Sequence, residues 1–173
     1  KSLNQAEFVM EGAREDVGVW PWVMHTPTEV LVGVVRSKTF FTAEYHLLKS
    51  KDKLVQIPLQ ESAEVQGYYE GQLIFTLRED WQLAGLDFKM GSLLAFDLKK
   101  FQVEQTLPSI QTLAVAGPRT SITGVYETPS GMLVSLLDNV RGKVIKFERE
   151  EDTGAWASTP VSLPQNGSLS VSS

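Results

Sequence analysis

Short runs of alternating apolar and polar residues recur along this chain, separated by glycine, proline, aspartate, asparagine or serine. The runs are rich in valine, isoleucine, leucine, phenylalanine, tyrosine and threonine, a composition typical of short β-strands joined by turns. No segment shows the pattern of a long helix. The sequence therefore predicts strands at Ala6–Met10, Asp16–Met24, Glu29–Val35, Phe40–Lys49, Lys53–Leu59, Ala63–Tyr69, Gln72–Arg78, Ser92–Leu98, Ile110–Ala116, Thr120–Glu127, Gly131–Asp138, Lys143–Glu148 and Trp156–Leu163.

The predicted strands group into repeated units of four. Residues 63–77 and 120–136 share an aromatic strand, a turn with glutamate and glycine, and then an apolar strand. First strands begin near residues 16, 63 and 120. A repeat of roughly 40–50 residues is typical of β-propeller blades. We interpret Glu79–Met90 as an insertion that lengthens the middle unit.

We therefore predict an all-β fold, a partial β-propeller of about three four-stranded antiparallel blades. The chain is expected to be a single propeller segment with blades at about residues 16–59, 63–116 and 120–163, and with residues 1–12 and 165–173 as flanking strands or tails. Ala6–Met10 would be the outer strand of a preceding blade, and Ser168–Ser172 would begin a further unit. A β-sandwich or an irregular barrel is the alternative that the same pattern allows.

Composition restricts the classes of function. With 42% hydrophobic and 21% charged residues the chain is typical of globular proteins, and its net charge of −5 argues against a nucleic-acid partner. No stretch approaches the roughly 18 apolar residues that cross a bilayer, so we expect a soluble protein, cytoplasmic or periplasmic. The lack of cysteine does not decide the compartment. Because the chain begins with Lys1 and shows no signal segment, we interpret it as a piece of a longer protein.

Patterns for catalysis and for metal binding are missing from the sequence. A serine nucleophile usually needs a histidine base, but His25 and His46 fall in a predicted turn and a predicted strand, and no G-x-S-x-G motif occurs. The spacings of metal ligands and of phosphate-binding loops are also missing. We therefore expect no catalytic residue, cofactor or metal in this chain. Trp20 and Trp22 are interpreted as core residues, with a sugar-binding platform as the alternative.

Three segments resemble the non-catalytic propeller of bacterial prolyl-oligopeptidase-family serine peptidases. They are Leu77-Arg-Glu-Asp-Trp81, Gly91-Ser-Leu-Leu-Ala-Phe-Asp97 and Leu136-Leu-Asp-Asn-Val-Arg-Gly-Lys143, and the match runs over most of residues 5–163. In that family an α/β-hydrolase domain carries Ser, Asp and His and cleaves short peptides after proline, and this domain is absent from the sequence. The resemblance implies a non-catalytic segment that covers the active site of such a peptidase and gates the access of short peptides.

Strand direction indicates where the catalytic domain would lie. In a blade of four antiparallel strands, the connection between the second and third strands lies on the face where the chain enters and leaves the blade. A hydrolase domain joined by short connections is therefore expected on that face. The expected interdomain or gating contacts are Arg78, Asp80, Trp81, Asp138 and Arg141. The alternative is that Asp138-Asn139 only forms a turn and that Arg78 pairs locally with Asp80.

Two other interpretations of function stay open. The chain could be a protein- or glycan-binding propeller module of an unrelated multidomain protein, or a free-standing enzyme whose site shows no recognisable motif, because fold alone does not fix function. In any of these cases, the end blades would leave an apolar sheet face uncovered. The isolated segment is therefore expected to self-associate.

Overall fold

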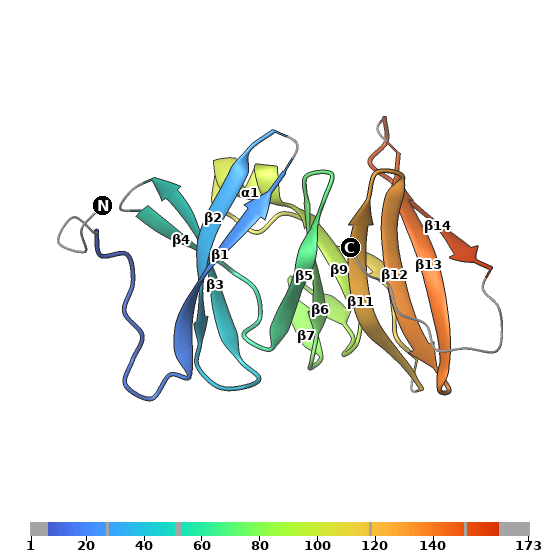
Figure 1. The fold of residues 1–173 in the computed structure, drawn as a ribbon, viewed down its shortest axis with the longest axis horizontal. Coiled ribbons are helices and arrows are strands. Elements are labelled where there is room, and N and C mark those ends of the chain that lie inside the picture. The colour runs from blue at the N-terminus through green and yellow to red at the C-terminus, as the bar shows by residue number, and fades with distance from the viewer. Residues whose placement is uncertain (1–6, 27, 51–52, 118, 151, 163–173) are drawn as a thin grey trace.

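The computed structural model describes residues 7–26, 28–50, 53–117, 119–150 and 152–162. In these ranges the chain forms three four-stranded antiparallel sheets that stand side by side, together with a small two-stranded sheet (Figure 1). The strand orders are β1-β2-β3-β4, β10-β9-β6-β5 and β11-β12-β13-β14, so each sheet takes its strands in the order of the chain. This confirms the predicted all-β fold of three four-stranded propeller blades.

The elements have the following bounds. The first sheet comprises β1 (Gly18–His25), β2 (Val30–Ser37), β3 (Ala43–Ser50) and β4 (Lys53–Ile57). The second comprises β5 (Ala63–Tyr69), β6 (Gln72–Leu77), β9 (Leu93–Asp97) and β10 (Gln111–Ala114). The third comprises β11 (Thr120–Thr128), β12 (Gly131–Asp138), β13 (Arg141–Arg149) and β14 (Trp156–Val161). The small sheet pairs β7 (Trp81–Leu83) with β8 (Leu86–Phe88), and helix α1 (Leu98–Glu104) lies between β9 and β10.

The strands agree with the predicted pattern except in three places. Every predicted strand from Asp16–Met24 onward overlaps a strand of the structure, but β3 begins at Ala43, so the prediction that Phe40 and Phe41 start a strand is wrong. Residues 7–10 form no strand, which makes the predicted strand Ala6–Met10 wrong there. Ala6 and the predicted strand Ser168–Ser172 lie outside the described residues. The insertion Glu79–Met90 contains the β7–β8 hairpin, and neither the hairpin nor α1 was predicted.

The second sheet is buried on both of its faces. Side chains alternate along a strand, so Phe75 and Phe96 face the first sheet while Ile74 and Leu93 face the third. All four side chains are fully buried, and the rings of Phe75 and Phe96 pack edge to face with centroids 6.0 Å apart. Burial on both sides explains why β6 and β9 are almost continuously apolar instead of alternating.

Connections between strands gather on two opposite faces of the molecule. The connections between the second and third strands of each sheet, residues 38–42, 78–92 and 139–140, lie at the bottom of Figure 1. Helix α1 lies at the top, where Phe101 closes the core between the first and second sheets. The chain also enters β1 from the bottom of this view. We call the face of the second-to-third connections the lower face and the opposite one the upper face.

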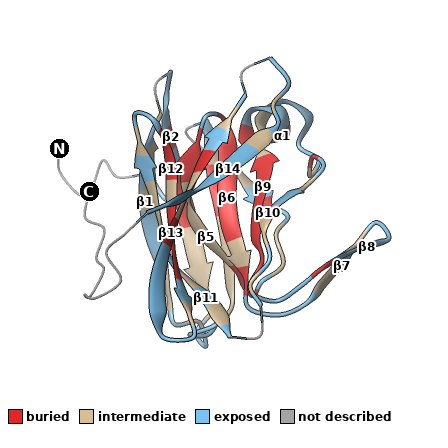
Figure 2. Cartoon of the chain, turned by 90° about the vertical axis from the view of Figure 1, so that its right-hand side faces the viewer, coloured by how far each residue is buried: buried red, intermediate tan, exposed pale blue. Residues whose placement is uncertain are grey.

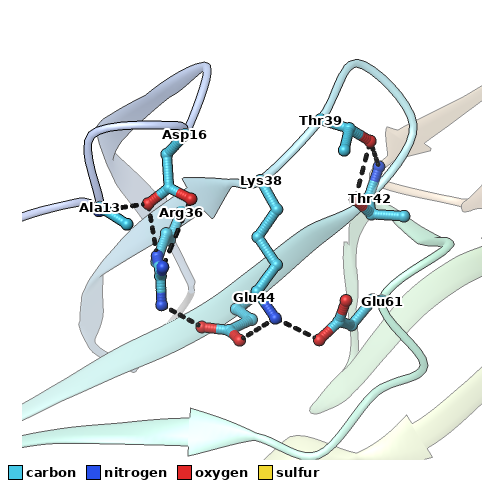
Figure 3. Close-up of polar contacts among 8 residues, drawn as sticks. All are labelled: Ala13, Asp16, Arg36, Lys38, Thr39, Thr42, Glu44 and Glu61. Atoms are coloured by element: carbon cyan, nitrogen blue, oxygen red, sulfur yellow. Dashed lines mark hydrogen bonds and ion pairs between the residues drawn. The ribbon is translucent and has the colours of Figure 1, made fainter.

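A chain of ion pairs braces the first sheet at its lower end (Figure 3). Arg36 Nε lies 2.6 Å from Asp16 Oδ2, and Arg36 Nη1 lies 3.5 Å from Glu44 Oε2. Lys38 Nζ lies 2.8 Å from Glu44 Oε1 and also pairs with Glu61. These contacts join the segment before β1, strands β2 and β3, and the connection to the second sheet.

The ion pairs change the ionisation of the groups that form them. The hydrogen bond from the Arg36 guanidinium lowers the pKa of the Asp16 carboxyl, and the hydrogen bond from Lys38 lowers the pKa of Glu44. Conversely, Asp16 raises the pKa of Arg36. Both carboxylates therefore favour folding in their ionised form.

Gly33 in β2 allows two groups to approach the backbone closely. A Cβ atom at this position would overlap the carbonyl oxygen of His46 on β3 and the Cζ2 atom of the Trp22 ring. Trp22 packs against the core between the first and second sheets, as predicted. Trp20, by contrast, is 58% exposed, so its prediction as a core residue is wrong.

Gly33→Ala is expected to destabilise the chain by about 1–3 kcal/mol, because the added methyl group forces apart backbone and ring atoms that are already in contact. Urea unfolding measures the change in the free energy of unfolding. Gly67→Ala on β5 is the control, since a Cβ there meets nothing within 4 Å. An unchanged midpoint for Gly33→Ala would show that the two groups do not pack over this glycine.

Asp16→Asn is expected to lower the unfolding midpoint at neutral pH, and the difference from the parent sequence should shrink in acid. The contribution of a carboxylate with a lowered pKa is complete above its unfolded value, 3.8 for Asp16 and 4.5 for Glu44, and is lost as the pH falls through the lowered folded value. Thermal unfolding between pH 7 and pH 2 tests this. Asp152→Asn, at an exposed loop residue, should give a difference that does not depend on pH in this way.

Candidate interdomain face

Arg78 and Asp80 lie at the lower end of the second sheet, and each contacts a neighbour of its own chain. Arg78 Nη2 lies 2.8 Å from Glu64 Oε2, so the local pairing of Arg78 with Asp80 is wrong. Asp80 Oδ2 instead lies 2.8 Å from Lys89 Nζ, and Asp80 Oδ1 accepts a hydrogen bond from the Met90 backbone N–H at 2.8 Å. The hydrogen bond from Lys89 lowers the pKa of Asp80. Asp80 thereby closes the base of the β7–β8 hairpin.

Trp81 begins the β7–β8 hairpin and fixes it to the core. Its ring centroid lies 6.4 Å from that of Phe75 in an edge-to-face arrangement and 6.0 Å from that of Phe88. Phe88 is buried, whereas Leu86 near the tip of the hairpin is exposed. Figure 2 shows that the hairpin projects away from the sheets. Trp81 therefore fixes the projecting β7–β8 hairpin to the core.

Asp138 and Arg141 flank the turn between β12 and β13, opposite one another in the strand register. Asp138 Oδ2 lies 2.6 Å from Lys143 Nζ, and its Oδ1 accepts hydrogen bonds from Asn139 Nδ2 at 3.1 Å and Thr120 Oγ1 at 3.4 Å. The hydrogen bond from Lys143 lowers the pKa of Asp138. Arg141 is exposed. Asp138 thus forms the turn, as the alternative interpretation expected, and also ties it to the start of β11.

A groove of about 420 Å³ runs between the second and third sheets at the lower face. Arg78, Glu64 and Met90 line it from the second sheet, and Thr120 and Ile122 from the third. Thr120 also contacts Asp138. Arg78 therefore lies on one side of the groove, and the Asp138 turn borders the other side through Thr120.

The second-to-third connections also expose apolar side chains that the sequence analysis missed. Phe40 is 84% exposed, Phe41 69%, Met90 61% and Val140 90%. High β-propensity placed the two phenylalanines in a strand, although the threonines on either side, Thr39-Phe-Phe-Thr42, were a signal for a turn. The lower face therefore presents apolar tips beside the predicted charged residues.

Groups for other kinds of site are not assembled in the described part of the chain. In that part, no three His, Cys, Asp or Glu side chains are grouped as a metal site would require. His25 ends β1, and His46 is buried on β3, where burial lowers the pKa of its imidazole. Among the same residues, no helix has the length and apolar character needed to cross a membrane.

Comparisons with known proteins give two related peptidases and one similar structure. An uncharacterized peptidase of Sinorhizobium fredii is 30% identical over 179 aligned residues, which cover 100% of this chain. An uncharacterized peptidase of Rickettsia prowazekii is 27% identical over 128 aligned residues, or 70% of this chain. A solved structure of a post-proline cleaving enzyme from Rickettsia typhi superposes with a TM-score of 0.83 over 95% of this chain, at 24% identity. No family model matches the chain.

The matched region is a minor part of each of these proteins. The chain spans 24% and 18% of the two related peptidases and 24% of the solved chain. The sequence similarity is to peptidases, and the structural similarity is to a segment of a post-proline cleaving enzyme that has the same fold. The resemblance of this chain to a propeller segment of the prolyl-oligopeptidase family is thereby confirmed.

Proposed function

We propose that this chain is the non-catalytic propeller segment of a prolyl-oligopeptidase-like serine peptidase, and that it covers the active site and admits only short peptides. In this proposal an α/β-hydrolase domain of the same polypeptide docks on the lower face. Arg78, Asp80, Trp81, Asp138 and Arg141 then contact the domain directly or hold the elements that do.

The direction of the chain is the observation that supports the proposal most. The chain enters β1 at the lower face, and the fourth strand of each sheet runs toward that face (Figure 1). A domain joined to either end by a short connection therefore lies at this face and not at the upper one. The related proteins are named as peptidases and are several times longer than this chain, which leaves room for such a domain.

The packing of the three sheets suits a wall that restricts substrate size. The sheets share two continuous cores, one on each side of β6 and β9, so they cannot separate to admit a large substrate without losing buried apolar contacts. The projecting β7–β8 hairpin extends the wall near the lower face (Figure 2). Exclusion of large or folded substrates then follows from the geometry of this wall.

Trp81→Ala in the full-length peptidase is expected to raise the ratio of kcat/KM for long peptides to that for short ones, because the hairpin loses its anchor on Phe75. Steady-state hydrolysis of proline-containing peptides of increasing length measures this ratio. Trp156→Ala is the matched control. It removes an equivalent ring contact, to Tyr69 at 5.8 Å, at the upper end of the third sheet, away from the lower face. Equal ratios in both variants and the parent sequence would contradict the gating role.

The reading frame that encodes this chain gives an independent test of the proposal. We expect it to encode a strand-bounded G-x-S-x-G motif followed by Asp and His, outside residues 1–173. The isolated chain should show no peptidase activity. A reading frame without such a domain would overturn the proposed function.

The isolated chain is expected to self-associate through the uncovered faces of its end sheets. Val23, Val30 and Val32 are exposed on the face of the first sheet that points away from the second, and Val23 and Val32 are cross-strand partners. Val23→Lys with Val32→Lys should reduce association by at least about tenfold, since charge on a packed apolar face is costly. Sedimentation at several concentrations measures this, with Val103→Lys on α1 as the control. A parent chain that stays monomeric throughout would contradict the expectation.

A further inference from the structure

We propose that four apolar side chains of the lower face, Phe40, Phe41, Met90 and Val140, are the anchors on which the α/β-hydrolase domain seats. We call them the apolar tips. The inference rests on the proposed function and goes beyond it. It assigns the main interdomain contact to apolar side chains from all three sheets, and no longer to the charged residues predicted from the sequence.

The two faces of the molecule differ in the side chains that their connections expose. Each second-to-third connection at the lower face carries at least one strongly exposed apolar residue. At the upper face, the described residues of the first-to-second connections are Thr26, Thr28, Glu29, Glu70, Gly71, Pro129 and Ser130. The described residues of the third-to-fourth connections there add one strongly exposed apolar side chain, Val103, which is 80% exposed. Exposed apolar residues scattered singly need no explanation, but their repetition at equivalent positions of three blades on one face marks a contact surface.

Val140 is exposed at the cost of backbone strain. The β12–β13 turn has two central residues with positive φ, 47° at Asn139 and 68° at Val140. Two other two-residue turns have the same pattern with glycine second, Glu70-Gly71 and Ala84-Gly85. A β-branched residue is an outlier in this conformation, and strain of this kind concentrates where a side chain is needed for contact. The third turn thus carries a side chain at the position where the other two carry glycine.

Phe40 and Phe41 are held in place before any partner arrives. Thr39 and Thr42 close their turn: the hydroxyl oxygens lie 2.8 Å apart, and Thr39 Oγ1 accepts a hydrogen bond from the Thr42 N–H group at 3.1 Å (Figure 3). Thr39 Oγ1 also accepts a hydrogen bond from the Phe41 N–H group at 3.1 Å. Lys38, at the start of this turn, belongs to the chain of ion pairs that braces the first sheet. A rigid turn that displays aromatic rings loses little conformational entropy on binding.

Two of the predicted charged residues, Asp80 and Asp138, are paired within the chain and position the tips. Asp80 accepts the Met90 N–H and pairs with Lys89, while Asp138 closes the Val140 turn with Lys143. Charges that are already paired within the chain gain little from a partner. Interface centres are correspondingly poor in charged residues and rich in aromatic residues and methionine. Asp80 and Asp138 are therefore positioning residues.

The hydrolase domain fits the apolar tips better than a second copy of this chain does. The described chain enters β1 at the lower face, and the fourth strands run toward it (Figure 1). The tips come from connections of all three sheets, and Met90 lines the groove between the second and third sheets. A second copy would instead meet the uncovered faces of the end sheets, where the cross-strand partners Val23 and Val32 are exposed.

Val140→Gly tests the inference because it should act in opposite directions in two proteins. In the isolated 173-residue chain it removes strain at a positive φ and should raise the unfolding midpoint by about 2–4 °C. In the full-length peptidase it removes an anchor and should speed hydrogen exchange of the amides of residues 38–42 and 139–141. The double variant Phe40→Ser with Phe41→Ser should accelerate the same exchange about tenfold. Val103→Ser on the upper face should leave both proteins unchanged.

The outcomes separate this inference from the proposed function. Lower-face amides that exchange more slowly in the full-length protein than in the isolated chain, and variants that undo the difference, support both. A catalytic domain in the reading frame, with equal exchange in the two proteins, overturns the apolar tips and leaves the proposed function standing. Protection that grows with the concentration of the isolated chain assigns the tips to a second copy and also overturns the inference. A reading frame without a catalytic domain overturns both.

Discussion

The second sheet is buried on both of its faces, and the positions of the first and third sheets follow from this burial. A single four-stranded sheet in water exposes at least one apolar face, and here Phe75 and Phe96 need the first sheet while Ile74 and Leu93 need the third. The three sheets therefore stand in a fixed order with their strands running in matching directions. Because of this alignment, equivalent connections of all three blades reach the same face.

Because the blades are aligned, connections that are far apart in the sequence form one surface. The ion pairs around Arg36, the Asp80 contacts at the hairpin and the Asp138 contacts at the β12–β13 turn are far apart in sequence, yet each fixes a connection at the lower face. The Lys89–Asp80 and Lys143–Asp138 pairs are largely exposed, and an isolated ion pair of this kind contributes little to stability, whereas the Asp16 side chain is buried. Their main consequence is geometric, since they hold the backbone that displays Phe40, Met90 and Val140.

Val140 is both exposed and in a strained backbone conformation, and this combination indicates a role for its side chain. An exposed valine is ordinary, and a positive φ in a hairpin turn is ordinary, but a β-branched residue with both properties is not. The Glu70-Gly71 turn shows that the same chain uses glycine where no side chain is needed. The proposed contact with a catalytic domain gives a physical reason for the strain at Val140.

Alternation and turn residues are local properties of the chain. The sequence alone therefore predicted most of the strands, their grouping in fours, the family resemblance and the face on which the connections lie. Five candidate residues could be placed on the lower face for the same reason. The folded structure was needed to show that Arg78 pairs with Glu64 and not Asp80, that Trp81 anchors a hairpin, and that Phe40 and Phe41 lie outside the strand. Those outcomes depend on atoms from distant segments, which no local pattern encodes.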